Sequence, residues 1–477
     1  MSAVLIKNGL VYDGMGTPPK KTDILVQRSR IARLGDFGRR EAERVVDATG
    51  AIVVPGLIEV GFEAETSDEL LSEEAGRSFL GKGVTTVLDG TDGSSLAPLI
   101  APLRGANHAW LKLEEFWRTL EERRTAFNLG VLVGYAELRQ AFTKGRARDL
   151  DMREMGQLIA IIRESFRAGA LGIGLGNAEM LRLSEWELLA LAEEASRAKR
   201  VLVLHLSGNG DIFGDTLAKI IAVAKKSGVS IELSHFEPRA QEAGAFHSAL
   251  GAIEKQAARA NINFDIFPMP LTRLPLTDLL PSWFPSGSRE ETLADLKSLH
   301  AKDRLLAHFK KMPLAELRIA NVPRHLRFLK GKRLGDLASN WGTRPERALL
   351  RLAAMTGLEC RFFESRVDRE ILEEAILNAR SIFTASFHEV ERDLNDLMAA
   401  ASCGGKLPLE QVIAKFTSLP AKKFGLARRG SIAPDYFADI VILRDLKVQT
   451  VFVSGVPVFE DGVFAAKRVG TPVRAEE

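Results

Sequence analysis

The sequence is poor in cysteine. Cys360 and Cys403 are the two cysteines among its 477 residues, and they do not form a Cys-x-x-Cys pair. Two distant cysteines exclude the disulfide framework on which small secreted domains depend. We therefore expect both to be core or surface thiols rather than metal ligands.

The sequence also lacks an excess of charge of either sign. It has 65 basic and 62 acidic residues, which gives a formal net charge of +3. This balance argues against a nucleic acid or an anionic membrane as a partner. We expect a small-molecule ligand instead, and the composition is compatible with a homo-oligomer.

Long apolar runs are missing as well. No run approaches the roughly 20 apolar residues that a membrane-spanning helix needs. The N-terminal stretch MSAVLIKNGL contains Lys7 and Asn8 before any long apolar run develops, so it does not resemble a signal peptide. These absences predict a cytoplasmic protein.

Short, almost continuously apolar runs recur along the middle of the chain, as expected for parallel strands buried on both faces. The segments between them mostly have helical periodicity. The alternation predicts a (β/α)₈ barrel, and there is no glycine-rich dinucleotide motif to favour the competing open, doubly wound sheet. The eight predicted strands are Val53–Val60, Val84–Asp89, Leu129–Tyr135, Ala170–Leu175, Val201–His205, Ile231–His235, Ile262–Phe267 and Ser381–Ser386.

The two ends of the chain are rich in short β-type segments separated by turn signals such as Ser454-Gly455 and Asp461-Gly462. We predict that residues 1–52 and 425–477 together form one small β-sandwich beside a barrel over 53–424. The stretch from about 270 to 370 is too long for one β/α repeat. It predicts an insertion, either a lid or a small helical subdomain.

Polar residues stand at the ends of several predicted strands, where a barrel carries its active site. His205 ends VLVLH, His235 ends IELSH, and Asp92 follows the second strand in VLDGTDGSS. The two histidines and the aspartate are candidate ligands for one metal ion. The alternative interpretation is that the histidines only cap their strands and that Asp92 hydrogen-bonds within a Gly-Thr-Asp-Gly turn.

Several segments resemble the amidohydrolase superfamily, in particular the N-acyl-D-amino-acid deacylases (D-aminoacylases). They follow the family order along most of the chain, from about Val4 to Phe464. The segments that carry the resemblance are VVPGLIEV, GKGVTTVLDGTDGSSLAPL, HLSGNGD, ELSHFEP, FDIFPMP, LPSWFPSG and FTSLPAKKFGLARRGSIAPDYFADIVIL.

The resemblance implies a barrel with a β-sandwich and zinc-dependent hydrolysis of an acyl amide. The family places a His-x-His on strand one, a cysteine on strand two and one histidine each on strands five and six. His205 and His235 match the last two. Asp92 stands at the cysteine position, and Gly61 and Glu63 stand where the strand-one histidines belong. A binuclear zinc centre is therefore not expected.

Other family positions also differ. Phe387 stands where the family has its catalytic aspartate, although His388 and Glu389 follow it. Phe267 and Met269 replace two tyrosines, and Ser207 replaces an arginine that could hold a substrate carboxylate. We predict a non-hydrolytic homologue, a pseudoenzyme with a ligand-binding, regulatory or assembly role.

The alternative is a mononuclear zinc hydrolase acting on the amide C–N bond of N-acyl amino acids. In that case Asp92, His205 and His235 hold one zinc ion and leave an open position for water. Glu63 would then be a fourth ligand or a displaced general base. The cofactor prediction is accordingly no metal or one zinc ion.

Overall fold

The computed structural model divides the chain into two compact units. Unit 1 comprises residues 1–269, 370–386 and 392–477, and unit 2 comprises residues 270–369 and 387–391. Among the described helices, none has the length and apolar character to cross a bilayer. The structure describes residues 3–62, 70–99, 110–144, 148–176, 180, 183–206, 210–236, 243–256, 258–270, 272–281, 283–284, 289–296, 298–364, 368–385 and 394–476.

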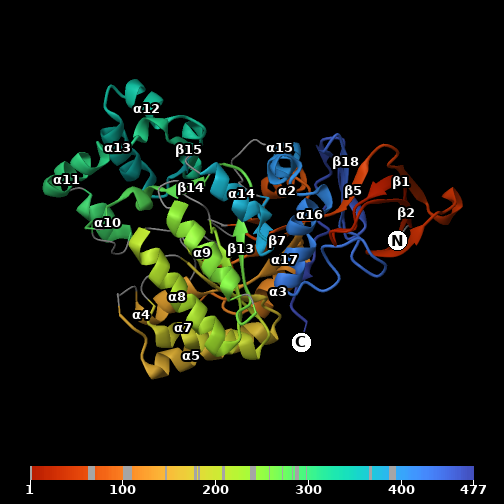
Figure 1. The fold of residues 1–477 in the computed structure, drawn as a ribbon, viewed down its shortest axis with the longest axis horizontal. Helices are drawn as coiled ribbons and strands as arrows, with labels where there is room; N and C mark the ends of the chain where they lie inside the picture. The colour runs from red at the N-terminus through yellow and green to blue at the C-terminus, as the bar shows by residue number, and fades with distance from the viewer. Residues whose placement is uncertain are drawn as a thin grey trace. The chain divides into compact units, whose positions relative to one another are not determined.

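Both chain ends build one sheet in unit 1, as the sequence predicted. Strand β5 pairs antiparallel with β18, with Val53 opposite Ile442, and this pairing joins the two halves (Figure 1). Val53, Ile440 and Phe452 share one buried core. The strands are β1 (Val4–Val11), β2 (Lys20–Gln27), β3 (Arg30–Gly35), β4 (Arg44–Asp47), β5 (Ile52–Pro55), β18 (Ile440–Arg444), β19 (Lys447–Val453), β20 (Val456–Glu460) and β21 (Val463–Phe464).

Two predicted turns connect the last strands of this sheet. Ser454 and Gly455 have φ values of 50° and 76°, and Asp461 and Gly462 have values of 47° and 82°. Positive φ at both central residues is what a two-residue type I′ hairpin requires, and it explains glycine at the second position.

The predicted barrel strands are present, and each pairs in parallel with its neighbour along the chain. Strand three is split into β8 and β9, and strand eight is short. The strands are β6 (Leu57–Glu59), β7 (Val84–Asp89), β8 (Asn128–Val131), β9 (Val133–Gly134), β10 (Gly172–Leu175), β11 (Val201–His205), β12 (Ser230–Ser234), β13 (Ile262–Ile266) and β17 (Ser381–Phe383).

One strand differs from the prediction that residues 425–477 belong to the sandwich. The segment β22 (Pro472–Val473) pairs with β8 of the barrel. Val473 is buried with Ile58, Leu88 and Val203 in the barrel core. The chain end therefore contributes to the barrel as well as to the sandwich.

Helices separate the barrel strands. In α5 one apolar face is buried through Met155, Leu158 and Ile162. The helices of unit 1 are α2 (Glu73–Leu80), α3 (Leu113–Arg123), α4 (Tyr135–Thr143), α5 (Met152–Arg167), α7 (Glu185–Arg197), α8 (Gly210–Ser227), α9 (Ala243–Lys255), α14 (Arg369–Leu377), α15 (Leu394–Ala401), α16 (Leu409–Phe416) and α17 (Ser418–Lys423), with 3-10 turns η1 (Arg39–Glu41) and η6 (Cys403–Gly405).

At the start of α7, one polar side chain caps the helix and another joins it to α4. Ser184 caps the helix by accepting a hydrogen bond from the Glu187 N–H. The Glu187 side chain, however, is fully buried and accepts hydrogen bonds from Tyr135 and from Arg139 Nε, the latter at 2.9 Å. This buried carboxylate therefore joins α4 to α7.

Unit 2 is an α+β module with its own apolar core, which includes Leu305, Ile319, Leu349 and Phe362. Three short strands, β14 (Thr272–Pro275), β15 (Arg318–Asn321) and β16 (Arg361–Glu364), form an antiparallel sheet in the order β14-β16-β15. The prediction of a helical subdomain was therefore incomplete. The helices are η3 (Leu276–Leu279), α10 (Arg289–Asp295), α11 (Leu299–Phe309), η4 (Leu314–Glu316), η5 (Arg324–Leu329), α12 (Leu334–Asn340) and α13 (Pro345–Thr356).

Candidate functional site

The two predicted histidines lie together at the carboxyl ends of neighbouring barrel strands. His205 is the last residue of β11, and His235 directly follows β12. Their ring centroids are 4.9 Å apart, with an angle of 40° between the ring planes. Two imidazoles this close can act on the same metal ion or the same ligand oxygen.

The backbone of His235 is held in an unusual conformation. Its φ is +53°, in the left-handed region that few residues other than glycine adopt. Its N–H donates to Asp265 Oδ1 at 3.0 Å, and the N–H of Phe236 donates to the Asp265 carbonyl at 3.2 Å. Asp265, buried on β13, thus fixes the direction in which the His235 ring leaves strand six. Local strain of this kind is concentrated at functional sites.

The loop that contains Asp92 lies across the ends of strands three and four. A Cβ on Gly174 would be 1.8 Å from the Gly90 carbonyl oxygen, and a Cβ on Gly134 would be 2.6 Å from the Ser95 nitrogen. Gly93 has a φ of +93°, and a Cβ on it would be 2.2 Å from the Gly176 nitrogen. Glycine at these positions is what lets the loop contact the neighbouring backbone directly.

Asp92 itself makes the turn contact that the alternative interpretation predicted. Its Oδ1 accepts a hydrogen bond from the Ser94 N–H at 3.2 Å. Burial, together with the nearby carboxylates of Asp89 and Glu137, raises the pKa of Asp92 to about 8. Burial also raises the pKa of Asp89 to about 7. Asp92 can therefore hold a proton at neutral pH in the absence of a cation.

The structure does not join all the predicted ligands into one cluster. Over the part of the chain that is described, no three His, Cys, Asp or Glu residues group closely enough to hold a metal ion. The structure brings His205 and His235 together. The three-ligand set that adds Asp92 to this pair stays a prediction. Glu63, Ser207 and the segment with Phe387, His388 and Glu389 lie outside the described residues.

The end of strand one contains a hydrogen-bonded cluster around Glu59. Both oxygens of Glu59, which is fully buried, accept hydrogen bonds. Glu59 Oε1 accepts from the Gly61 N–H at 2.8 Å and from Thr384 Oγ1 at 2.6 Å, and Oε2 accepts from the Ala385 N–H at 2.8 Å. The first and last barrel strands, β6 and β17, are not hydrogen-bonded to each other through their backbones. The Glu59 side chain instead connects the end of β6 to the residues that follow β17.

This cluster fills the space beside Gly61. A Cβ built on Gly61 would be 3.0 Å from Thr384 Oγ1 and 3.2 Å from Thr384 Cβ, which is tighter than ordinary van der Waals contact. A side chain at position 61 would therefore require Thr384 to shift by a few tenths of an ångström. The family resemblance directed attention to Gly61, but it did not identify the hydrogen bonds that Glu59 and Thr384 make beside it.

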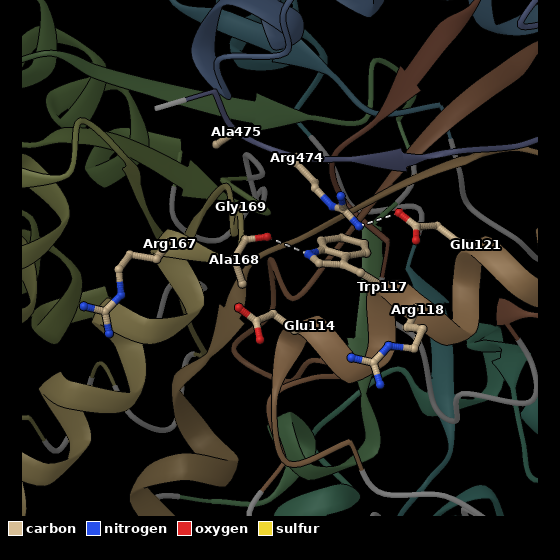
Figure 2. A pocket seen from close by; sticks show the side chains of 9 residues that line it. All are labelled: Glu114, Trp117, Arg118, Glu121, Arg167, Ala168, Gly169, Arg474 and Ala475. Atoms are coloured by element: carbon tan, nitrogen blue, oxygen red, sulfur yellow. Dashed lines mark hydrogen bonds and ion pairs between the residues drawn. The ribbon is translucent and has the colours of Figure 1, made fainter.

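A cavity of about 360 Å³ lies elsewhere on unit 1, between α3, the end of α5 and the segment after β22 (Figure 2). Residues 167–169 precede β10, so this cavity is at the amino ends of the barrel strands, away from the histidines. Trp117 Nε1 donates to the Ala168 carbonyl at 2.8 Å, and Arg474 pairs with Glu121 at 2.6 Å. The lining residues are Glu114, Trp117, Arg118, Glu121, Arg167, Ala168, Gly169, Arg474 and Ala475.

Comparison with known proteins shows homology to D-aminoacylases. The family described as "Amidohydrolase family" matches residues 350–458. N-acyl-D-glutamate deacylase of Alcaligenes xylosoxydans xylosoxydans is 27% identical, with 92% of this chain and 86% of that protein covered. D-aminoacylase of the same organism is 24% identical, with 98% and 96% covered.

Solved structures show the same fold. N-acyl-D-glutamate deacylase from Bordetella bronchiseptica, complexed with zinc and a phosphonate inhibitor, superposes with a TM-score of 0.79 at 22% identity over 99% of both chains. A D-aminoacylase studied for its binuclear metal centre gives a TM-score of 0.79 at 21% identity, again over 99% of both chains. The fold is thus the amidohydrolase barrel with a β-sandwich domain, as predicted.

Proposed function

We propose that this D-aminoacylase-like protein of the amidohydrolase fold binds a small-molecule ligand at the mouth of its barrel without hydrolysing N-acyl-D-amino acids. The supporting observation is the cluster of Glu59, Gly61 and Thr384 at strand one. Metal-assisted amide hydrolysis requires an activated water, a polarised carbonyl and a proton carrier. Gly61 offers no ligand, Thr384 crowds the space beside it, and the sequence has Phe387 at the position that corresponds to the family's proton carrier.

The histidine pair can still bind a ligand at the mouth of the barrel. Imidazoles with centroids 4.9 Å apart can each donate a hydrogen bond to one carbonyl or carboxylate oxygen. The Asp265 contact keeps the His235 backbone in place for this role. A ligand with such an oxygen, bound but not cleaved, suits a regulatory or sensing homologue of a deacylase.

A second function is supported by one relative. The solved D-aminoacylase with the binuclear centre is described in terms of one-metal activation and second-metal attenuation. By that precedent, a chain without the strand-one histidines can still act as an enzyme with one metal ion. In this alternative His205, His235 and Asp92 would hold one zinc ion, with Glu63 as a further ligand or base. A bound zinc ion would polarise the scissile carbonyl and lower the pKa of its water.

Activity distinguishes the two functions. The purified protein, assayed on a panel of N-acetyl-D-amino acids with and without added Zn²⁺, is expected to show no turnover above that of the His205→Ala/His235→Ala control. A missing general acid–base group alone lowers rates by about 10²–10⁴-fold. Turnover that needs zinc and disappears in the control would instead establish the mononuclear hydrolase.

Metal content gives an independent measurement. After mild dialysis against buffer, elemental analysis is expected to find at most one zinc ion per chain, because strand one offers no histidine ligand. The His205→Ala/His235→Ala protein, checked for folding by circular dichroism, should lose any zinc that the native protein holds. Two tightly held zinc ions per chain would contradict the proposed loss of the second site.

A further inference from the structure

Unit 2 contains a concentration of positive charge that the average composition does not reveal. Between residues 318 and 333 the sequence RIANVPRHLRFLKGKR has six basic residues and no acidic one, whereas the whole chain carries a net charge of +3. The acidic residues that flank this stretch are Glu316 and Asp336. The expectation that the chain has no anionic partner came from the whole-chain balance and does not apply to this segment.

The segment is anchored to the unit by its apolar residues. Leu326, Leu329 and Leu334 are buried, on or beside the short helix η5. The turn that follows is tied to β15, since the Gly331 N–H donates to the Ile319 carbonyl at 2.8 Å and the Ile319 N–H donates to the Lys332 carbonyl at 2.9 Å. The outward side chains are therefore carried by a well-bonded backbone.

Five of these basic side chains are exposed to solvent. Arg318 and Arg333 are partners in an antiparallel bridge, and directly opposite residues project from the same face. Arg327, Lys330 and Lys332 are exposed as well. We call this set of five residues, together with Phe328, the basic face.

An apolar ring stands among these cations. Phe328 is 65% exposed, more than any other phenylalanine that the structure describes. The Lys332 ammonium lies 5.8 Å from the centre of its ring. Glu316 is 3.6 Å from Arg333, but both side chains are more than half exposed, so this pair neutralises little of the charge.

We propose that the basic face docks unit 2 onto an anionic lipid surface. Lysine and arginine side chains would contact lipid phosphates, and Phe328 would enter the boundary between headgroups and acyl chains. A single-stranded nucleic acid is a poorer match, because proteins that bind it present several aromatic rings along a groove for successive bases. The basic face offers one aromatic ring.

Vesicle co-sedimentation of the full-length protein tests this inference. Binding is expected to vesicles of phosphatidylglycerol and phosphatidylcholine but not to vesicles of phosphatidylcholine alone, and it should weaken as salt is raised. Lys330→Glu/Lys332→Glu should weaken binding by at least about tenfold, since each basic residue near the surface contributes a separate attraction. Phe328→Ser should also weaken binding while the salt dependence remains.

Lys310→Glu/Lys311→Glu is the matched control. It removes the same charge from two exposed residues of unit 2 that lie outside the basic face. The control should bind vesicles like the native protein, with all variants checked for an unchanged melting temperature. Equal loss in both double variants, no binding at low salt, or binding of a mixed-sequence single-stranded oligonucleotide in preference to vesicles would each overturn the proposal.

Discussion

Lys423→Met is expected to lower the free energy of unfolding by about 1–3 kcal/mol, because it removes a charged hydrogen-bond donor from its acceptors. The Lys423 side chain is 5% exposed on α17 and lies 3.9 Å from the fully buried Glu232 of β12. Its Nζ also donates to the Ile231 carbonyl at 2.6 Å, to Asn263 Oδ1 at 3.1 Å and to the Asn261 carbonyl at 3.3 Å. The substitution therefore leaves these three acceptors without this donor and Glu232 without a neighbouring cation.

Urea unfolding of the native and variant proteins measures this difference. Glu232→Gln is the matched control, and it should change the free energy of unfolding by much less. Over the described part of the chain, neither Glu232 oxygen accepts a hydrogen bond, whereas Lys423 keeps three other partners. Equal losses in Lys423→Met and Glu232→Gln would show that the pair, rather than the lysine, carries the stability.

Comparison with Glu232→Gln also predicts how the free energy of unfolding depends on pH. Burial raises the pKa of Glu232 well above its ordinary value of 4.5, opposed by Lys423 and reinforced by Asp265. The folded state then retains this proton at pH values where the unfolded chain loses it. The stabilising contribution of Glu232 is thus complete below about pH 4.5 and is lost as pH rises toward the raised pKa. The stability of the native protein should fall relative to Glu232→Gln between pH 5 and 7, and parallel pH curves would contradict this.

The sequence was sufficient to predict the barrel because buried parallel strands are apolar along their whole length. The runs ending in His205 and His235 became β11 and β12 with boundaries shifted by at most one residue. Their histidines meet because the carboxyl ends of parallel strands lie on one face of a barrel. That part of the site follows from strand order alone.

Other parts of the site depend on contacts between distant residues. Glu59 and Thr384 are separated by 325 positions, and no local pattern connects them. Glu232 lies within an apolar run that predicts a strand correctly, but its partner Lys423 comes from a helix near the other end of the chain. In unit 2, the strands of the small sheet have four residues each and are separated by helices, so their pairing was not predictable from periodicity.

Thr384 determines whether position 61 can hold a side chain, and substitutions at both positions test this. Gly61→Ala is expected to lower the free energy of unfolding by about 1–3 kcal/mol, since the new Cβ would lie 3.0 Å from Thr384 Oγ1 and 3.2 Å from its Cβ. In a Thr384→Gly background both atoms are gone, and the same substitution should have little effect. Thr384→Ser is the matched control, because serine keeps both atoms and should not relieve the contact.

The same steric relation governs any attempt to rebuild the second metal site. Gly61→His/Glu63→His supplies the family's strand-one histidines, yet it is expected to gain no zinc while Thr384 fills the space next to residue 61. Adding Thr384→Gly should raise the zinc content toward one further ion per chain, with Glu59 still held by the N–H groups of residue 61 and Ala385. Elemental analysis of the folded proteins measures this difference without reference to activity. A further zinc ion bound while Thr384 is still present would show that strand eight yields to the new side chain and that the native site lacks only its ligands.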